Sequence, residues 1–254
     1  MDASSLRIDR LEVVQLESVD STNGYLQRVA NSVNKPIVAI ANGQSAGRGQ
    51  QGTHWDSLPG DATFSILLEP KELPAGRTFL LSQLLSLALR DVLSGLGVAA
   101  EVKWPNDILV QRRKVCGVLI ETHLQGAYVR NAILGVGMNL AVRPLGFPNY
   151  PTPAATLADW VNVESLPSPF SFVQMLVAAW NACLERTEGD MENSIQRSYL
   201  ASLFNGVGFH DFEDVDGAFR AEIADVRPTG ELVLRRGNGT QRAYPFKGVR
   251  QKVF

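Results

Sequence analysis

Short apolar runs in the first 140 positions have the length and residue types of β-strands. They cover residues 11–16, 35–41, 63–68, 98–110, 115–122 and 128–140. Residues 79–96 instead repeat apolar side chains at helical spacing, and the run stops at Gly95 and Gly97, where glycine commonly ends helices. A shorter helix is predicted to follow residues 20–23, because Asp20, Ser21 and Thr22 are all suited to capping its first turn.

The pattern changes twice in the second part of the chain. A loop at residues 144–153 contains four prolines, and helical spacing then dominates residues 154–204, including 170–185 and 191–203. Beyond residue 205, short alternating runs at 219–226, 231–235 and 241–244 are separated by glycine-containing turns. These runs predict a small antiparallel barrel, so we expect one domain at residues 1–204 and a second at residues 205–254.

Composition narrows the class of protein. The 254 residues are 45% hydrophobic and 20% charged, with a formal net charge of −2, which is typical of a globular protein with its own core. The charge gives no general attraction to nucleic acid or to an anionic membrane, and no apolar run is long enough to span a bilayer. Two cysteines and an N-terminus without a signal peptide predict a reducing compartment, the cytoplasm.

A glycine-rich polar loop separates two of the predicted strands. Gly47, Gly49 and Gly52 spell G-x-G-x-x-G, but the dinucleotide-binding fingerprint also needs a helix that opens at these glycines. Pro59 and Gly60 interrupt any such helix, and the next run is a strand. A loop of this kind that carries Arg48 is better suited to folding over a small ligand and offering backbone N–H groups to its anionic part.

Polar residues mark two further breaks in the strands and helices. Ser21 and Thr22 either cap the helix that follows them or hold the carbonyl or carboxylate of a ligand at its N-terminus. Proline has no backbone N–H to donate to the hydrogen-bond ladder of a sheet, so Pro105 should force a bulge or turn that exposes its polar neighbours. A plain turn without a role in binding is the alternative, because an Asn-Asp pair is common in turns. Those neighbours are Lys103, Asn106 and Asp107.

Glycines and charges suggest where a ligand would approach. Gly135 and Gly137 lie inside a predicted strand, where glycine indicates close approach by a ligand or another backbone. The charged residues beside the loops suggest an α/β enzyme that handles an anion, with solvated surface charges as an equally good explanation; they are Arg48, Lys103, Asp107 and Lys114. Neither the three histidines nor the two cysteines have zinc-ligand spacing.

Several blocks together resemble the biotin protein ligase family, in its order and spacing over residues 11–140. The blocks are Ser21-Thr22-Asn23, Gln44-x-Ala46-Gly47-Arg48-Gly49, Trp55, Lys103-Trp104-Pro105-Asn106-Asp107, Lys114-x-x-Gly117 and Gly135-x-Gly137-x-Asn139. The resemblance implies an α+β fold: a mixed or antiparallel sheet with flanking helices, like that of class II synthetases, followed by an SH3-like barrel. It also implies an enzyme that activates biotin with ATP and Mg²⁺ to biotinyl-5′-adenylate and transfers biotin to a lysine of a biotin carboxyl carrier protein.

The resemblance also implies roles for individual residues. Lys114 would lie between the biotin carboxylate and the α-phosphate, Arg48 would close over the adenylate, and Asp107 would take the proton of the acceptor lysine. Ser21, Thr22 and Gln44 would bind the ureido ring, Lys103 would face phosphates, and Trp55 would either stack near adenine or pack in the core. The full implied binding set is Ser21, Thr22, Asn23, Gln44, Gly47, Arg48, Gly49, Gln50, Trp55, Lys103, Asn106, Lys114, Gly117, Gly135, Gly137 and Asn139, with no metal ligand among them.

Two positions depart from the family pattern. Gln50 replaces an arginine that helps to retain the adenylate, which predicts weaker retention or compensation from Lys103 and Lys114. Gly248 stands where family tails often have a glutamate, which puts a contact between the tail and the active site in doubt. The chain before Ser21 is too short for the winged helix-turn-helix with which some relatives repress transcription, so we expect no nucleic-acid partner.

Two alternative functions remain at this point. A lipoate or octanoyl transferase of the same superfamily would use Cys116 as an acyl nucleophile, although a buried, inert thiol is the simpler interpretation of this residue. A binding protein without catalytic activity would have lost its loop function at Gln50. The sequence does not fix the oligomeric state, a homodimer being one option.

Overall fold

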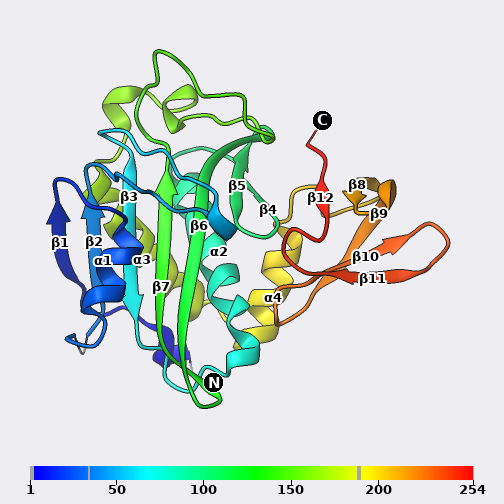
Figure 1. Cartoon of the computed structure of the whole chain (residues 1–254), viewed down its shortest axis with the longest axis horizontal. Helices are drawn as coiled ribbons and strands as arrows, with labels where there is room; N and C mark the ends of the chain where they lie inside the picture. The colour runs from blue at the N-terminus through cyan, green and yellow to red at the C-terminus, as the bar shows by residue number, and fades with distance from the viewer. Residues whose placement is uncertain (1–2, 34, 188–189, 254) are drawn as a thin grey trace.

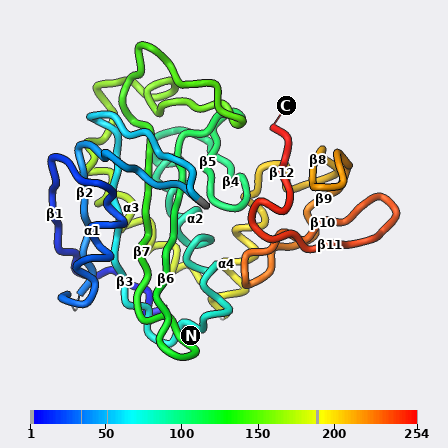
Figure 2. Tube along the Cα trace, viewed as in Figure 1, coloured from blue at the N-terminus to red at the C-terminus, as the bar shows by residue number. Residues whose placement is uncertain are grey.

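The computed structural model describes residues 3–33, 35–187 and 190–253, which form a large mixed sheet with a smaller sheet attached beside it (Figures 1 and 2). The larger sheet has seven strands in the order β1-β2-β3-β7-β6-β5-β4. Only β1 and β2 pair in parallel, and all the other neighbours are antiparallel. In sheet order the strands are β1 (Glu12–Leu16), β2 (Ile37–Ala41), β3 (Ala62–Leu68), β7 (Tyr128–Met138), β6 (Arg113–Gln125), β5 (Asp107–Val110) and β4 (Glu101–Lys103).

The two faces of this sheet are covered by different helices, because successive side chains of a strand point to opposite faces. On one face α1 (Thr22–Val29) packs through Leu26 against Ile37, Leu67 and Ile133. On the other face lies the main core, to which β3 contributes Phe64 and which includes α2 (Phe79–Gly95) and α3 (Pro169–Glu185). Figure 1 shows α1 in front of the sheet and these two helices behind it. The predicted α+β fold with a mixed sheet and flanking helices is therefore confirmed.

Local capping explains where the helices begin. The hydroxyl of Ser21 accepts a hydrogen bond from the N–H of Gly24 at the start of α1, so the predicted cap is Ser21. Ser168 caps α3 in the same way, with Pro169 at its first turn. Asp190 caps α4 (Met191–Ala201), which packs against α2. Residues 154–168 hold only short 3₁₀ turns, so the helical region predicted from residue 154 begins in fact at Pro169.

The C-terminal strands form an open sheet, and the closed barrel predicted for residues 205–254 is not confirmed. The hydrogen-bonded order is β11-β10-β9-β8-β12, and in the described part of the chain the edge strands β11 and β12 do not pair with each other. Strand β12 has two residues and pairs only with β8, which is too little to close a barrel. The strands are β8 (His210–Asp214), β9 (Gly217–Val226), β10 (Leu232–Arg236), β11 (Gln241–Tyr244) and β12 (Arg250–Gln251).

Two of these C-terminal strands had no clear pattern in the sequence. Strand β8 contains one apolar side chain, Phe212, which is fully buried, and β12 is too short to show alternation. The smaller sheet is fastened to the larger part of the protein where Trp104, in the turn between β4 and β5, donates its indole N–H to the carbonyl of Gly230 at 2.8 Å. Phe246 packs its ring on the same indole, with 5.7 Å between ring centroids.

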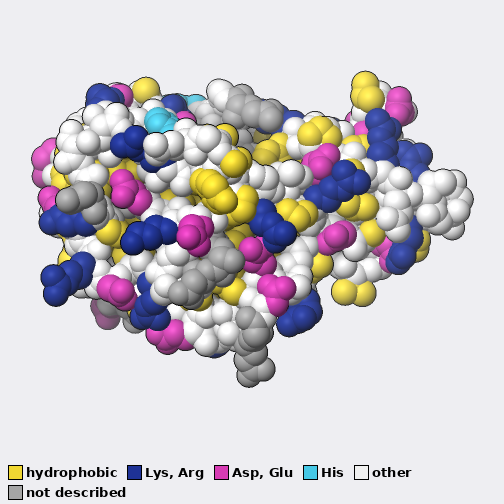
Figure 3. Space-filling view, turned by 90° about the horizontal axis from the view of Figure 1, so that it is seen from below, with side chains coloured by type: hydrophobic (Ala, Val, Ile, Leu, Met, Phe, Trp, Pro, Cys, Tyr) yellow, Lys and Arg dark blue, Asp and Glu magenta, His cyan; other side chains and the backbone are white. Residues whose placement is uncertain are grey.

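The surface carries no dominant charge on the face seen in Figure 3, where basic and acidic side chains are interspersed over most of the area. This agrees with the formal net charge of −2. Among the described residues, no helix is both long enough and apolar enough to cross a membrane.

Candidate active site

Three rows of side chains on the α1 face of the sheet form the floor of the candidate site. The strand register places Thr63, Gly137 and Gly117 side by side in one row. The next row along the strands holds Ser65, Gly135 and Leu119, and the third includes Glu121. Because side chains alternate between faces, every one of these odd-numbered residues points away from the main core. The site therefore lies beside α1, at the N-terminal end of that helix.

The two strand glycines leave gaps that other side chains fill. A Cβ added at Gly137 would lie 2.2 Å from Cε2 of Trp55, so the indole of Trp55 rests directly on this glycine. A Cβ added at Gly135 would lie 2.3 Å from Oδ1 of Asn23. Both glycines are closely approached, but by the side chains of Trp55 and Asn23 and not by the ligand or second backbone that the sequence predicted.

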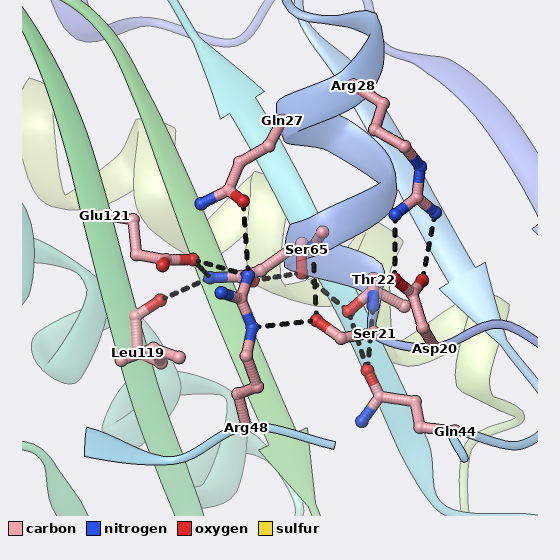
Figure 4. A network of polar contacts seen from close by, with 12 residues as sticks. Asp20, Ser21, Thr22, Gln27, Arg28, Gln44, Arg48, Ser65, Leu119 and Glu121 are labelled. Atoms are coloured by element: carbon pink, nitrogen blue, oxygen red, sulfur yellow. Dashed lines mark hydrogen bonds and ion pairs between the residues drawn. The ribbon is translucent and has the colours of Figure 1, made fainter. Parts of the chain in front are cut away.

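A chain of hydrogen bonds, here called the polar cluster, links the start of α1 to the sheet (Figure 4). The backbone N–H of Thr22 donates to Oε1 of Gln44 at 2.8 Å, and the hydroxyls of Thr22 and Ser65 are 2.7 Å apart. Ser65 donates to Oδ1 of Asn23 at 2.5 Å, and the amide of Asn23 donates to Glu121 at 2.6 Å. Ser21, Thr22, Asn23 and Ser65 are all buried, so their orientations are fixed by these bonds.

Arg48 lies over the polar cluster and is paired with a carboxylate. Its Nη2 is 3.1 Å from Oε2 of Glu121, and its Nε donates to the hydroxyl of Ser21 at 3.3 Å. Nη2 also donates to Gln27 on α1 at 3.5 Å. Figure 4 shows the guanidinium between α1 and β6, where it ties the loop to both elements. Its charge is therefore shared with Glu121.

The loop that carries Arg48, residues 47–55, is called the flap below. The N–H of Trp55 donates to the carbonyl of Gly47 at 3.0 Å, and the N–H of Gly49 donates to the carbonyl of Thr53 at 2.6 Å. Within the flap, Gln50–Gly52 form a single 3₁₀ turn, and the next element is the strand β3. No helix opens at the glycines, which confirms that the G-x-G-x-x-G pattern is not a dinucleotide fingerprint.

Lys114 and Asp107 form an ion pair at the centre of the site, with 2.6 Å between Nζ and Oδ1. The side chains are 25% and 15% exposed, so the pair is partly shielded but still reaches the solvent. Nζ of Lys114 is also 5.5 Å from the centroid of the Trp55 ring. Backbone bonds on both sides of Lys114, to Pro153 and Ala155, hold this lysine against the end of the proline-rich loop.

Two cavities meet at this ion pair. The polar cavity, about 240 Å³, extends from Lys114 over the sheet floor to the polar cluster. The proline-loop cavity, about 280 Å³, extends the other way and is walled by Phe147, Tyr150 and Pro151. Both cavities are lined by Lys114 and Asp107, together with flap residues Thr53, His54 and Trp55. A ligand group placed beside Lys114 would thus be within reach of molecules in either cavity.

Most of the predicted site residues line the polar cavity. They are Ser21, Thr22, Asn23, Gln44, Arg48, Gly49, Gln50, Trp55, Asn106, Asp107, Lys114, Gly117, Gly135 and Gly137. Asn139 lines the proline-loop cavity instead, and Gly47 lies against the backbone of Trp55, on the outer side of the flap. Lys103 lines neither cavity; it is opposite Asp107 in the β4–β5 pair.

The turn at residues 104–106 matches the bulge or turn predicted there, but its neighbours are less exposed than expected. Lys103, Asn106 and Asp107 are all half-buried. Burial lowers the pKa of the Lys103 ammonium, while the negative charge of Asp107 opposes this shift. Asn106 is held in place because its amide donates to the carbonyl of Val118 at 2.6 Å.

Several residues at the site were not predicted. Glu121 lies two and four positions beyond Leu119 and Gly117 on the same strand face, and this spacing could have identified it. Phe147 and Tyr150 come from the proline-rich loop, and Lys247 reaches the polar cavity from the C-terminal sheet. Nothing local in the sequence indicates that these three residues line the two cavities. Burial and a hydrogen bond to Asp56 raise the pKa of the Tyr150 phenol to about 12.

Cys116 takes no part in the site. Its side chain is fully buried in the core on the opposite face of β6, and burial raises the pKa of its thiol. A thiol in this environment is not a nucleophile, because the thiolate is the reactive form. Within the described residues, no group of three or more His, Cys, Asp or Glu side chains is arranged to hold a metal ion.

Known proteins with similar sequences include biotin ligases. The sequence model of the biotin/lipoate A/B protein ligase family matches residues 15–139. The bifunctional ligase/repressor BirA of Bacillus subtilis is 31% identical over 233 residues, which cover 89% of this chain and 70% of that protein. The biotin–[acetyl-CoA-carboxylase] ligase of Paracoccus denitrificans is 36% identical over 134 residues, covering 51% of this chain and 55% of that one.

A solved structure shares the fold. The biotin protein ligase of Aquifex aeolicus, crystallised with biotin and ATP, superposes with a TM-score of 0.75 over 95% of this chain and 99% of that one, at 22% identity. The length and identity of the match to the Bacillus protein establish the relationship, and the shared fold agrees with it. This protein belongs to the biotin/lipoate A/B protein ligase family.

Proposed function

We propose that this protein is an ATP-dependent biotin protein ligase. It joins biotin to AMP, releases pyrophosphate, and then transfers biotin to a lysine of a biotin carboxyl carrier protein. The observation that carries the proposal is the position of Lys114, at the junction of a polar cavity and a second cavity with aromatic walls. The relative named biotin–[acetyl-CoA-carboxylase] ligase and the fold shared with a biotin protein ligase support the choice of vitamin and acceptor.

Biotin occupies the polar cavity. Its ureido ring carries both donors and acceptors, and a buried polar ring must be matched by partners of both kinds. Ser21, Thr22, Asn23 and Gln44 supply hydroxyl, amide and backbone groups at one end of this cavity. The biotin carboxylate then points toward Lys114 at the other end.

ATP occupies the proline-loop cavity as its magnesium complex, with the α-phosphate at Lys114. In-line attack by the biotin carboxylate brings two anions together, and a fixed cation offsets their repulsion. The ammonium of Lys114 leaves Asp107 to meet these oxygens when they arrive. The mixed anhydride is sensitive to water, so closing of the flap over it preserves the product.

Transfer of biotin to the carrier uses the carboxylate of Asp107, which is free once Lys114 has moved to the phosphate. A lysine amine with an ordinary pKa near 10.4 is neutral for only about 0.04% of the time at pH 7. Asp107 orients the incoming ammonium and takes its proton, and the neutral amine attacks the carbonyl of the adenylate, with AMP leaving. Residues 1–204 form the main catalytic domain, and residues 205–254 form a second domain that contributes Lys247 to the polar cavity. The reaction takes place in the cytoplasm.

Labelled biotin, magnesium–ATP and a purified carrier domain test the proposal directly. The wild type is expected to release pyrophosphate and to label the carrier, and a carrier whose acceptor lysine is changed to arginine controls for specificity. Lys114→Ala is expected to lower adenylate formation by at least 100-fold, since charge stabilisation of this kind is worth about 10²–10³ in rate. Unchanged biotinylation by this variant would remove the mechanism, and transfer of octanoate or lipoate in place of biotin would favour the acyltransferase alternative.

A further inference from the structure

Lys247 lines the polar cavity although it lies 133 positions after Lys114 in the chain. It belongs to the turn between β11 and β12, so it comes from the smaller sheet and not from the catalytic sheet. Gly248 itself lines neither cavity, and the residue of the C-terminal tail that lines the polar cavity is its neighbour Lys247.

The turn that carries Lys247 is held firmly against the site. The N–H of Gly248 donates to the carbonyl of Pro245 at 2.8 Å, which closes the turn. Phe246 packs on the indole of Trp104 and also on the ring of Phe79, at a centroid distance of 5.9 Å. Trp104 is in the same turn as Asn106, so the anchor of the tail is next to the site residues of β5.

The backbone of this turn depends on a positive φ at Lys247 and on glycine at position 248. Lys247 has a φ of +64°, in the left-handed region, which is unfavourable for a residue other than glycine. A Cβ added at Gly248 would lie 2.9 Å from Pro245, so a glutamate at position 248 would force this turn to change. The surrounding packing thus holds an unfavourable conformation, which directs Lys247 to the cavity.

The flap supplies little free positive charge to the polar cavity. Residues 47–55 contain one arginine or lysine, Arg48, and its guanidinium is paired with Glu121. Position 50, which lines the same cavity, is a neutral glutamine. Lys114 therefore faces the two phosphate-bearing ligands, ATP and the adenylate, without an arginine from the 3₁₀ turn of the flap.

We propose that Lys247 is a phosphate-binding residue of the active site, which supplies from the C-terminal sheet the positive charge that Gln50 does not provide. Its ammonium contacts the α-phosphate where the two cavities meet at Lys114, first in ATP and then in the adenylate, so the tail helps to retain the intermediate. This inference rests on the proposed ligase function, because it requires a nucleotide phosphate at Lys114.

The test is to replace Lys247 by methionine, which keeps an apolar stem and removes the charge. Lys247→Met is expected to raise the KM for ATP and the rate of adenylate release about fivefold each, with the KM for biotin unchanged, since an exposed charge pair is worth up to about 1 kcal/mol. Lys247→Arg should behave like the wild type. Lys252→Met is the matched control, because Lys252 is an exposed lysine five positions further along that does not line the cavity.

A second substitution makes the test specific to charge. Adding Gln50→Arg to Lys247→Met should restore retention of the adenylate, because either position can then supply the cation. Release should also become less sensitive to salt in Lys247→Met than in the wild type. Wild-type retention in Lys247→Met, or failure of the arginine to restore it, overturns this inference while leaving the ligase intact. A wild type that forms no adenylate at all overturns the proposed function and, with it, this inference.

Discussion

Gly137 offers a strong test of how the floor of the site is built, through the substitution Gly137→Ala. The added Cβ would lie 2.2 Å from Cε2 of Trp55 and 2.5 Å from both Cζ2 and Nε1, whereas ordinary contacts are 3.4–4 Å. The indole must therefore move by about 1.2–1.8 Å. Its Nε1 is buried and has no hydrogen-bond partner among the described residues, so no polar bond resists this movement.

Gly137→Ala should lower the rate of adenylation more than it lowers the free energy of unfolding. Overfilling a well-packed site costs about 1–3 kcal/mol, and we expect the lower end because Trp55 is only half-buried and lies on a loop. Displacing the indole shifts the flap and removes the aromatic face that lies 5.5 Å from Nζ of Lys114. A displacement near 1 Å can lower a rate about 100-fold, so we expect adenylation to fall between 10-fold and 100-fold.

Biotin-dependent exchange of labelled pyrophosphate into ATP measures this step, and thermal unfolding measures the stability. Gly95→Ala is the matched control, because a Cβ at Gly95 meets nothing within 4 Å and alanine suits the end of α2. In a Trp55→Ala background the space is open, so Gly137→Ala should have little further effect. Normal exchange by Gly137→Ala, or the same loss in both backgrounds, would refute the packing of Trp55 on this glycine.

Two further predictions concern carboxylates. Glu121→Gln keeps an acceptor for the amide of Asn23 but removes the charge that pairs with Arg48. Because that pair is partly exposed, we expect the binding free energy of biotin to fall by about 1 kcal/mol, which calorimetry would measure as about fivefold weaker binding. Glu12→Gln, which breaks an exposed pair with Lys35, should leave binding unchanged, and equal effects of the two variants would contradict the role of Glu121. Asp107→Asn should slow transfer to the carrier at least 10-fold while changing pyrophosphate release less than about threefold, because an amide cannot accept the proton of the acceptor lysine. Equal losses in the two separately measured steps would show that Asp107 is not the base.

Much of the larger domain could be predicted from the sequence because its elements depend on local spacing. Short apolar runs with the residue types of β-strands located β2, β3 and β7, and the cap at Ser21 located α1. The polar residues at the start of α1 and the strand glycines were also recognisable as site residues. The C-terminal sheet was predicted less well, because β8 and β12 have too few apolar residues to show a period and closure depends on which strands meet.

The sequence by itself determined the strands of the larger sheet, the helices α1 and α2, and which block carries the central lysine. Tertiary structure alone decided that Trp55 fills the gap at Gly137, that Arg48 pairs with Glu121, and that Lys247 enters the cavity. The physical reason is the range of the interactions. Periodicity and capping depend on residues a few positions apart, whereas these arrangements bring together residues 73 to 133 positions apart and exist only after the sheets have packed.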